Sequence, residues 1–378
     1  MGLRQGTLEN MAVTAARQAD FWRGKRVLVT GHSGFKGSWL ALALHRSGAN
    51  VTGISLPPLT TPSLFTEAKI ADLCRSHLSD IRDAAGVAGL IRAARPEVVF
   101  HLAAQPLVRE SYRDPLTTFE TNVMGTVHVL EALRGLDGVR VAVMVTTDKV
   151  YRTAEIPGSH REDDPLGGHD PYSASKAASE MVIESYRQSY LAEQPVAVAS
   201  ARAGNVIGGG DWSEDRLIPD AVRAWQAGRV LRVRRPDAVR PWQHVLEPVS
   251  GYLVLAQRLW EQPSLAGAYN FGPELREAVK VRDLVELACA AYGDGAVDYG
   301  DGSEGPHESE WLVLDAGKAE SLLGLSQRWT LIEGVKRTMA WYRARQNGKD
   351  ARALCLADMS DFEGRAMGPA PARAKASG

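Results

Sequence analysis

Tyr172 and Lys176 stand four residues apart in the segment DPYSASKAASE, so their side chains would share one face of a helix. A positive charge close to a phenol favours the ionised phenolate. Such a tyrosine could take the proton from a sugar hydroxyl while hydride leaves the same carbon for an oxidised nicotinamide. This spacing also arises by chance on amphipathic helices, so the pair needs support from other motifs.

The triplet Thr147, Asp148 and Lys149 places an acid and a base directly after the strand-like run VAVMV. An ion pair on the surface is one interpretation of Asp148 and Lys149. However, open α/β sheets hold their ligands at the carboxyl ends of their strands. The position of the triplet therefore favours a functional site.

A glycine-rich turn, GHSGFKG, lies between a β-branched run at residues 25–30 and an apolar helical run. Gly31, Gly34 and Gly37 would let the backbone approach a pyrophosphate, which the amides at the helix N-terminus would then bind. The spacing GxxGxxG is the form used by short-chain dehydrogenases. An ordinary βα turn is the alternative, and His32 within it could contact the pyrophosphate or face solvent.

The second expected strand, residues 50–56, should end beside the adenosine ribose, where an acidic residue usually marks NAD. Ser55 occupies that place, and no Lys or Arg occurs between residues 51 and 66 to hold a 2′-phosphate. We therefore expect NAD, on the absence of a basic clamp. Asp80 and Ile81 follow another candidate strand and could contact adenine or simply begin a helix.

The 378 residues carry a net charge of −1, which does not indicate a nucleic-acid or membrane surface. Cys74, Cys289 and Cys355 are too scattered for a disulfide framework or a zinc site, so we expect no metal. No apolar run is long enough to span a membrane, and the N-terminus lacks the apolar core of a signal peptide. These features predict a cytoplasmic protein.

Strand-like and helical runs alternate along the chain, which predicts an α/β fold of the Rossmann type. We expect a doubly wound parallel sheet in residues 21–203, which would bind NAD. Residues 204–345 should form mainly a smaller C-terminal α/β lobe for the substrate, with segments returning to the first domain. Residues 1–20 read as an extension, and residues 346–378 as a partly disordered tail.

The motifs VTGHSGFKGSWL, VFHLAAQPLVRESY, TNVMGTVHVLEA, TTDKVY, DPYSASK, ARAGNVIGGGDW and RPWQHVLEP together resemble a known family. They are similar to the extended short-chain dehydrogenase/reductases that act on nucleotide-activated sugars, and more narrowly to the CDP-glucose 4,6-dehydratases. The resemblance extends over residues 21–342. It implies a Rossmann domain, a tightly held NAD that is reused in each cycle, and conversion of CDP-D-glucose to CDP-4-keto-6-deoxy-D-glucose and water.

The resemblance also implies catalytic roles. Tyr172 matches the base, Lys176 its partner and the contact to the nicotinamide ribose, and Thr147 the group that binds the 4-hydroxyl. Oxidation at carbon 4 would acidify the proton on carbon 5, elimination of the 6-hydroxyl would give an enone, and hydride would return to carbon 6. Asp148 could protonate the leaving hydroxide if burial keeps it protonated, and Lys149 could remove the carbon 5 proton if it is partly neutral. These two roles could also be shared differently.

Further binding residues follow from the same resemblance. Arg234 and Arg240 would hold the diphosphate, although they could lie on a charged edge strand. Trp212, Trp242 and His244 could contact cytosine or merely pack. The expected cofactor contacts are Gly31, His32, Gly34, Phe35, Lys36, Gly37, Ser55, Asp80, Ile81, Leu102, Ala103, Ala104, Gln105, Asn122, Thr146, Tyr172, Lys176 and Arg202. The expected substrate contacts are Gln105, Thr147, Asn205, Trp212, Arg216, Leu217, Ile218, Arg234, Arg240, Trp242, His244 and His307.

Other functions remain open. A dehydratase for a dTDP-, GDP- or UDP-sugar would share these motifs, while an NDP-sugar 4-epimerase would not need Asp148 and Lys149. A noncatalytic NAD-sensing protein would not need the complete set of reactive side chains. The resemblance further implies a homodimer joined by a four-helix bundle, from helices around residues 123–133 and 172–190, with a homotetramer as a further possibility.

Overall fold

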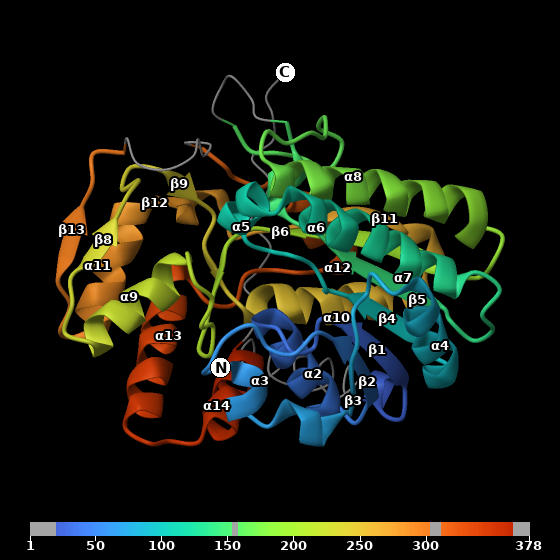
Figure 1. Ribbon diagram of the computed structural model, residues 1–378, viewed down its shortest axis with the longest axis horizontal. Coiled ribbons are helices and arrows are strands. Elements are labelled where there is room, and N and C mark those ends of the chain that lie inside the picture. Colours follow the sequence, from blue (N-terminus) through green and yellow to red (C-terminus); the bar gives the residue numbers. More distant parts are fainter. Residues whose placement is uncertain (1–19, 153–157, 303–310, 366–378) are drawn as a thin grey trace, which may run out of the picture.

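A seven-stranded sheet forms the centre of the molecule, and all its neighbouring strands are parallel (Figure 1). The computed structural model describes residues 20–152, 158–302 and 311–365. The strand order is β11-β6-β5-β4-β1-β2-β3. The predicted α/β fold with a doubly wound parallel sheet is confirmed. The strands span Arg26–Thr30 (β1), Asn50–Ser55 (β2), Arg75–Leu78 (β3), Val98–His101 (β4), Val141–Val145 (β5), Ala197–Ala203 (β6) and Gly267–Phe271 (β11).

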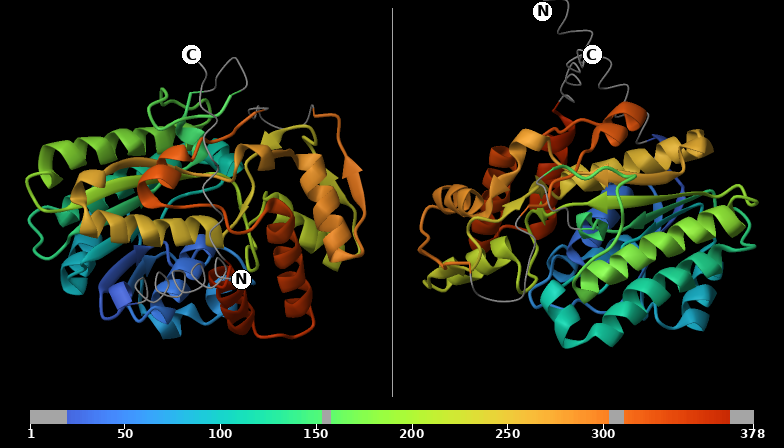
Figure 2. Two further views of the ribbon diagram at one scale, coloured as in Figure 1. Left: turned by 180° about the vertical axis from the view of Figure 1, so that it is seen from behind. Right: turned by 90° about the horizontal axis from the view of Figure 1, so that it is seen from above.

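Alternate side chains of the central strands enter two separate apolar cores, as the two-residue period of a strand requires. Val27 and Val29 pack in the core that includes Trp39 and Leu255, whereas Leu28 packs in the core on the other face. Figure 2 shows helices on both sides of the sheet. The first face carries α2 (Phe35–Arg46), α10 (Leu246–Glu261) and α12 (Gly317–Leu323), and the second carries α4 (Ala84–Ala94), α7 (Gly125–Leu133) and α8 (Pro171–Tyr186).

A smaller lobe lies beyond one end of the strands (Figure 1). The chain enters it after β6, returns to the sheet for α10 and β11, and then leaves again for α11. Its helices are α9 (Leu217–Gln226), α11 (Val281–Tyr292) and α13 (Leu331–Gln346). Three two-stranded pairs complete it: β7 (Val206–Ile207) with β10 (Gln243–His244), β8 (Leu231–Val233) with β13 (Val297–Tyr299), and β9 (Val239–Arg240) with β12 (Val279–Lys280).

Short helical segments connect the main elements and position several cleft residues. The 3₁₀ turn η3 (Asp148–Val150) follows β5 directly. The others are α3 (Leu64–Glu67), η1 (Ile70–Leu73), α5 (Val108–Arg113), α6 (Pro115–Phe119), η2 (Glu120–Met124), η4 (Arg187–Leu191), η5 (Pro263–Leu265) and η6 (Leu275–Glu277).

The part of the tail that the structure describes is more ordered than the sequence suggested. Helix α14 (Ala351–Glu363) begins where the carboxylate of Asp350 accepts the backbone N–H of Ala353. Cys355, Met359 and Phe362 are buried against the body of the protein. Residues 346–378 were expected to form a partly disordered tail, and this helix lies in the part of that tail that the structure describes. Residues 1–19 and 366–378 lie outside the described part.

None of the helices in the described ranges combines the length and the apolar character needed to cross a membrane. The same residues hold no group of three or more His, Cys, Asp or Glu side chains placed to bind a metal ion.

Candidate active site

A cleft of about 660 Å³ opens at the carboxyl ends of the central strands, between the sheet and the smaller lobe. The strand order reverses direction between β1 and β4, and open α/β sheets bind ligands at such a point. The turn between β1 and α2, the end of β5, the start of α8 and the loops of the lobe all contribute side chains to its walls.

The glycine-rich turn leaves backbone exposed to this cleft. Gly31 has φ +79°, and a Cβ on it would lie 2.7 Å from the backbone nitrogen of Ala103. A Cβ on Gly37 would overlap the carbonyl oxygen of Gly31. Helix α2 begins after Gly34 without a side-chain cap, so its first amides are available to an anion. The turn therefore has the shape and the donors that a diphosphate requires.

His32 does not extend its side chain into the cleft, contrary to the expected cofactor contact, and it does not face solvent either. The ring is 0% exposed, lies against Gly53 and shares a 2.7 Å hydrogen bond with the hydroxyl of Ser76. Burial lowers its pKa to about 4. The missing side chain of Gly53, in the middle of β2, makes room for the ring.

The end of β2 carries hydroxyl groups and no cation. Ser55 lines the cleft and forms a 2.6 Å hydrogen bond with Ser33, whose hydroxyl also donates to the carbonyl of Leu56 at 2.7 Å. Asp80 and Ile81 line the same region. The hydrogen bond from Arg82 holds the pKa of Asp80 below its usual value, so this carboxylate already has a charged partner.

Tyr172 and Lys176 lie in the first turns of α8, which begins where Asp170 accepts the backbone N–H of Ser173. The two side chains are 8% and 5% exposed, and both line the cleft. Burial raises the pKa of Tyr172 to about 12; a hydrogen bond with Thr147 acts against this rise. Burial therefore has a greater effect on the pKa of this phenol than the positive charge nearby.

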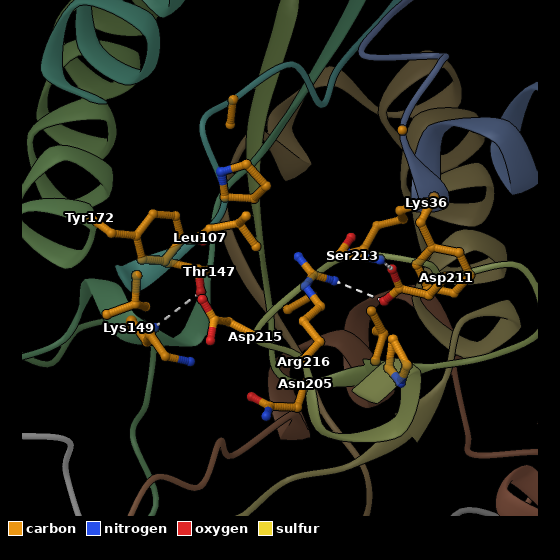
Figure 3. A pocket seen from close by; sticks show the side chains of 18 of the residues that line it. Lys36, Leu107, Thr147, Lys149, Tyr172, Asn205, Asp211, Ser213, Asp215 and Arg216 are labelled. Atoms are coloured by element: carbon orange, nitrogen blue, oxygen red, sulfur yellow. Dashed lines mark hydrogen bonds and ion pairs between the residues drawn. The ribbon is translucent and has the colours of Figure 1, made fainter. Parts of the chain in front are cut away.

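The triplet at the end of β5 is not a surface ion pair. Asp148 is 1% exposed, and its Oδ1 accepts the hydroxyl of Thr147 at 2.9 Å and lies 3.5 Å from Nζ of Lys149. Its Oδ2 is buried and has no hydrogen-bond partner among the described residues. Figure 3 shows Thr147 and Lys149 beside Tyr172 in the pocket. Oδ2 of Asp148 is therefore left for a ligand, on the same wall of the cleft as Tyr172.

Lys36 brings a basic side chain into the cleft. The sequence analysis had given it only as a cofactor contact in the glycine-rich turn. Its ammonium donates to the hydroxyl of Tyr252 at 3.3 Å. Burial, together with the charges of Arg216 and Lys176, lowers the pKa of Lys36 to about 7, while the charge of Asp148 acts in the opposite direction. Lys36, Lys176 and Arg216 all line the cleft and Arg216 and Lys176 lie near Lys36, so this part of the cleft would attract an anionic ligand.

The expected substrate contacts from the lobe lie on the opposite wall. Arg216 forms a 3.3 Å ion pair with Asp211, visible in Figure 3. Trp212 donates from its indole to Glu67 at 3.0 Å. All of the expected lobe residues in the described ranges except His244 line the cleft: Asn205, Trp212, Arg216, Leu217, Ile218, Arg234, Arg240 and Trp242. His307 lies outside the described residues.

Two expected contacts, Gln105 and Asn122, support the wall from behind. Asn122 is 1% exposed, and its side chain accepts the N–H of Gln105 at 2.8 Å and donates to the hydroxyl of Ser175 at 2.8 Å. It therefore joins the loop after β4 to α8. Neither side chain is part of the cleft surface.

Arg202 and His244 also lie away from the cleft surface, so the structure does not place them as the expected contacts. Arg202 forms a 2.8 Å ion pair with Glu180 inside the molecule. His244 is 2% exposed, and burial lowers its pKa to about 3. Its ring packs against Trp329 at 4.8 Å between centroids.

The remaining expected cofactor contacts belong to the surface of the cleft. Gly31, Gly34, Phe35, Lys36, Gly37, Leu102, Ala103, Ala104 and Thr146 all line the cleft.

Sequence reasoning missed a pair that joins the two walls. Arg109, near the start of α5, forms a 3.0 Å ion pair with Asp215 from the loop before α9. Asp215 has φ +58°, in the left-handed region that only a few residue types adopt readily. Nothing in the local pattern around Arg109 indicated this contact, because the two residues are 106 positions apart.

The fold and the cleft define a Rossmann-type protein of the extended short-chain dehydrogenase/reductase class, with a tyrosine and a lysine facing a dinucleotide-sized cleft. Comparison with known proteins agrees. The family model described as GDP-mannose 4,6 dehydratase matches residues 28–338. The chain belongs to this family.

Individual relatives and solved structures show which members of the family this chain resembles. A CDP-glucose 4,6-dehydratase from Salmonella typhimurium is 46% identical over 349 residues, which cover 91% of this chain and 97% of that protein. A dTDP-glucose 4,6-dehydratase from Streptomyces griseus is 32% identical over 84% of this chain and 93% of its own length. The structure of MoeE5 in complex with UDP-glucuronic acid and NAD has a TM-score of 0.73 at 27% identity, covering 85% of this chain and 100% of that chain.

Proposed function

We propose that this protein is an NAD-dependent enzyme that converts CDP-D-glucose to CDP-4-keto-6-deoxy-D-glucose and water. The observation that carries the proposal is the buried Asp148 beside Lys149, with a free carboxylate oxygen, in the same cleft as Tyr172 and Lys176. An oxidation alone needs only the tyrosine and the lysine. The extra acid and base support an elimination, as does the likeness to the Salmonella dehydratase.

NAD fits the β1 side of the cleft. The backbone at Gly31 and Gly34 and the first amides of α2 would hold the pyrophosphate, and Ser33 and Ser55 would meet the adenosine ribose. Bound there, NAD supplies an acceptor for the hydride of carbon 4 and a donor for carbon 6. No Lys or Arg occurs between residues 51 and 66, which supports NAD rather than a cofactor with a 2′-phosphate.

Tyr172 would take the proton of the 4-hydroxyl, which Thr147 would hold. The ammonium of Lys176 offsets the cost of the phenolate in this dry site. Once carbon 4 is a ketone, the proton on carbon 5 becomes acidic. Lys149, whose Nζ lies 3.5 Å from Asp148, would be the base that removes this proton. Asp148 would give its proton to the departing 6-hydroxyl, so that water leaves and the two electrons of the C5–H bond form the double bond.

The diphosphate of the substrate would lie on the opposite wall. Arg216, Arg234 and Arg240 line it together with Asn205, and guanidinium groups suit phosphate oxygens. Trp212 and Trp242 offer flat apolar surface for the base. These contacts support a nucleotide diphosphate sugar in general, and preference for cytosine is supported by the 46% identical relative.

We also propose residues 21–203 as the nucleotide-binding domain and residues 204–345 as mainly the substrate lobe, with α10 and β11 returning to the sheet. A homodimer through α7 and α8 is supported by large apolar side chains left exposed beside those helices. Met124, Met181 and Tyr190 are 46%, 61% and 42% exposed. Light scattering of Met181→Glu should show monomers where the parent chain is dimeric. A cytoplasmic location is part of the same proposal.

A screen of CDP-, dTDP-, GDP- and UDP-glucose with NAD, analysed by mass and by chromatography that separates sugar epimers, tests the function. The proposal expects a product lighter by one water from CDP-glucose. Accumulation of CDP-galactose, which has the mass of the substrate, would favour an NDP-sugar 4-epimerase instead. No change in any of the four substrates would support a noncatalytic protein.

A further inference from the structure

A buried carboxylate lies directly behind the catalytic face of α8. Glu180 is one helical turn beyond Lys176 and is 4% exposed. Its Oε2 accepts hydrogen bonds from the guanidinium of Arg202 at 2.8 Å and from the hydroxyl of Ser200 at 2.7 Å. Its Oε1 accepts the hydroxyl of Thr146 at 2.5 Å. Donors from β6 and from the end of β5 therefore fix this one side chain of α8.

Arg202 extends the cluster to the other end of the catalytic triplet. Its guanidinium donates to the hydroxyl of Tyr151 at 2.9 Å and to the carbonyl of Glu162 at 2.9 Å. Tyr151 in turn donates to the side chain of Asn270 at 2.6 Å. Thr146 and Tyr151 flank residues 147–150, so the Glu180–Arg202 pair is bonded to both ends of the segment that carries the acid and the base.

The charge of the same carboxylate also acts on Lys176. Burial lowers the pKa of Lys176 to about 8, and the charge of Glu180 opposes this by raising it. Lys36 at the start of α2 and His101 in β4 lie close enough to Lys176 for its charge to lower their pKa values. The titratable groups coupled to Lys176 are therefore Glu180 on its own helix, Lys36 and His101, and Tyr172 lies one turn away on the same helix.

We propose that Glu180, held by Arg202, is a positioning residue for the reaction, which fixes both ends of residues 147–150 and places a buried carboxylate one helical turn from Lys176. A buried ion pair stabilises a fold little more than packed apolar side chains would, because both charges lose water. The pair is better explained by its contacts to residues 147–150 and its place beside Lys176 than by a gain in stability. The statement about the reaction depends on the proposed function, whereas the charge of Lys176 does not.

Glu180→Gln keeps the size of the side chain and removes the charge. Loss of the opposite charge one helical turn from Lys176 should move the titration midpoint of Lys176 down by about one pH unit. NMR of protein labelled with ¹³C at the lysine ε carbon measures this midpoint directly, with the Lys176 signal identified by its loss in Lys176→Met. The alkaline limb of kcat against pH should move by the same amount.

Glu247→Gln is the matched control. Glu247 is also a largely buried carboxylate, but it accepts backbone N–H groups of Arg328 and Trp329 and does not line the cleft. Its loss should lower stability and leave the Lys176 midpoint in place. A midpoint that stays unchanged in folded Glu180→Gln would overturn the proposal.

Glu180→Gln leaves Arg202 buried without its partner and could unfold the protein for that reason alone. The double variant Glu180→Gln, Arg202→Gln removes both charges and should keep the lowered midpoint. If the double variant titrates like the parent, or fails to fold, the pair belongs to the fold and not to the reaction. Absence of dehydration by the parent protein would instead contradict the proposed function, and the NMR result would still decide the role of Glu180 toward Lys176.

Discussion

The two walls of the cleft are built in different ways. On the wall formed by β5, η3 and α8, Asp148, Tyr172 and Lys176 are at most 8% exposed, and buried side chains hold them from behind. On the lobe wall, the side chains of Arg216 and Asp215 come from loops and are 33% and 28% exposed, although Arg240 and Trp242 on the same wall are each 6% exposed. Proton transfer needs groups whose charge is set by a dry environment, whereas binding of a diphosphate tolerates water.

This difference predicts which variants slow the reaction and which weaken binding. Changes on the buried wall should lower kcat, because their groups act on the transition state. Changes on the lobe wall should raise KM and leave kcat nearly constant.

The largest effect is expected for Asp148→Asn. The amide cannot give a proton to the leaving hydroxide, so turnover should fall by about a hundredfold or more, while oxidation at carbon 4 persists. Rapid-mixing absorbance would show reduced cofactor accumulating on the enzyme. Asp211→Asn makes the same chemical change on the other wall, where it should act mainly on KM. Normal turnover in Asp148→Asn would remove this residue from the mechanism.

Arg234→Met should weaken substrate binding with little change in kcat. Loss of one charged hydrogen bond to phosphate is worth about 1.5 kcal/mol, or roughly a tenfold rise in KM. Steady-state kinetics measures both constants. Arg276→Met, at a side chain that is 80% exposed and outside the cleft, should change neither. A drop in kcat alone would mean that the two walls are not divided as described.

Lys36 should make stability depend on pH. Its pKa is lowered from 10.5 to about 7 in the folded protein, so the unfolded chain binds more protons between these values. The free energy of unfolding should therefore rise from pH 7 to pH 9, by at most about 1.4 kcal/mol per pH unit for this group. Urea denaturation at the two pH values should give a smaller rise for Lys36→Met. An equal rise in both proteins would contradict the lowered pKa.

The smallest effect is expected for the pair that joins the walls. The side chains of Arg109 and Asp215 are 30% and 28% exposed, and partly exposed ion pairs contribute about 0.2–1 kcal/mol. Arg109→Met should raise KM by no more than about fivefold, in line with that free energy. A double-mutant cycle with Asp215→Asn measures the coupling. A large loss of kcat would show that this contact assembles the catalytic wall.

The sequence was most informative where chemistry depends on local spacing. The glycine turn, the Thr-Asp-Lys triplet and the YxxxK pair are short segments whose backbone form follows from nearby residues, and the structure brings them to one cleft. The parallel sheet followed from alternating strand and helix patterns. These signals need no knowledge of which distant segments meet.

Contacts between distant segments could not be predicted in this way. Arg202 was expected at the cofactor, but the register of β6 against α8 points it to Glu180. His32 turned inward because Gly53 on the next strand left space, a relation that depends on strand order. A nearby positive charge was expected to favour the phenolate of Tyr172, and only the packed structure shows that burial raises the pKa of this phenol.

An isotope experiment tests the central claim most directly. CDP-glucose carrying deuterium at carbon 4 would be converted by the purified protein with NAD, and NMR of the product would locate the label. The account predicts a 4-keto-6-deoxy product with the deuterium at carbon 6, since the hydride taken from carbon 4 returns there after water has left. Deuterium retained at carbon 4 of CDP-galactose would contradict it.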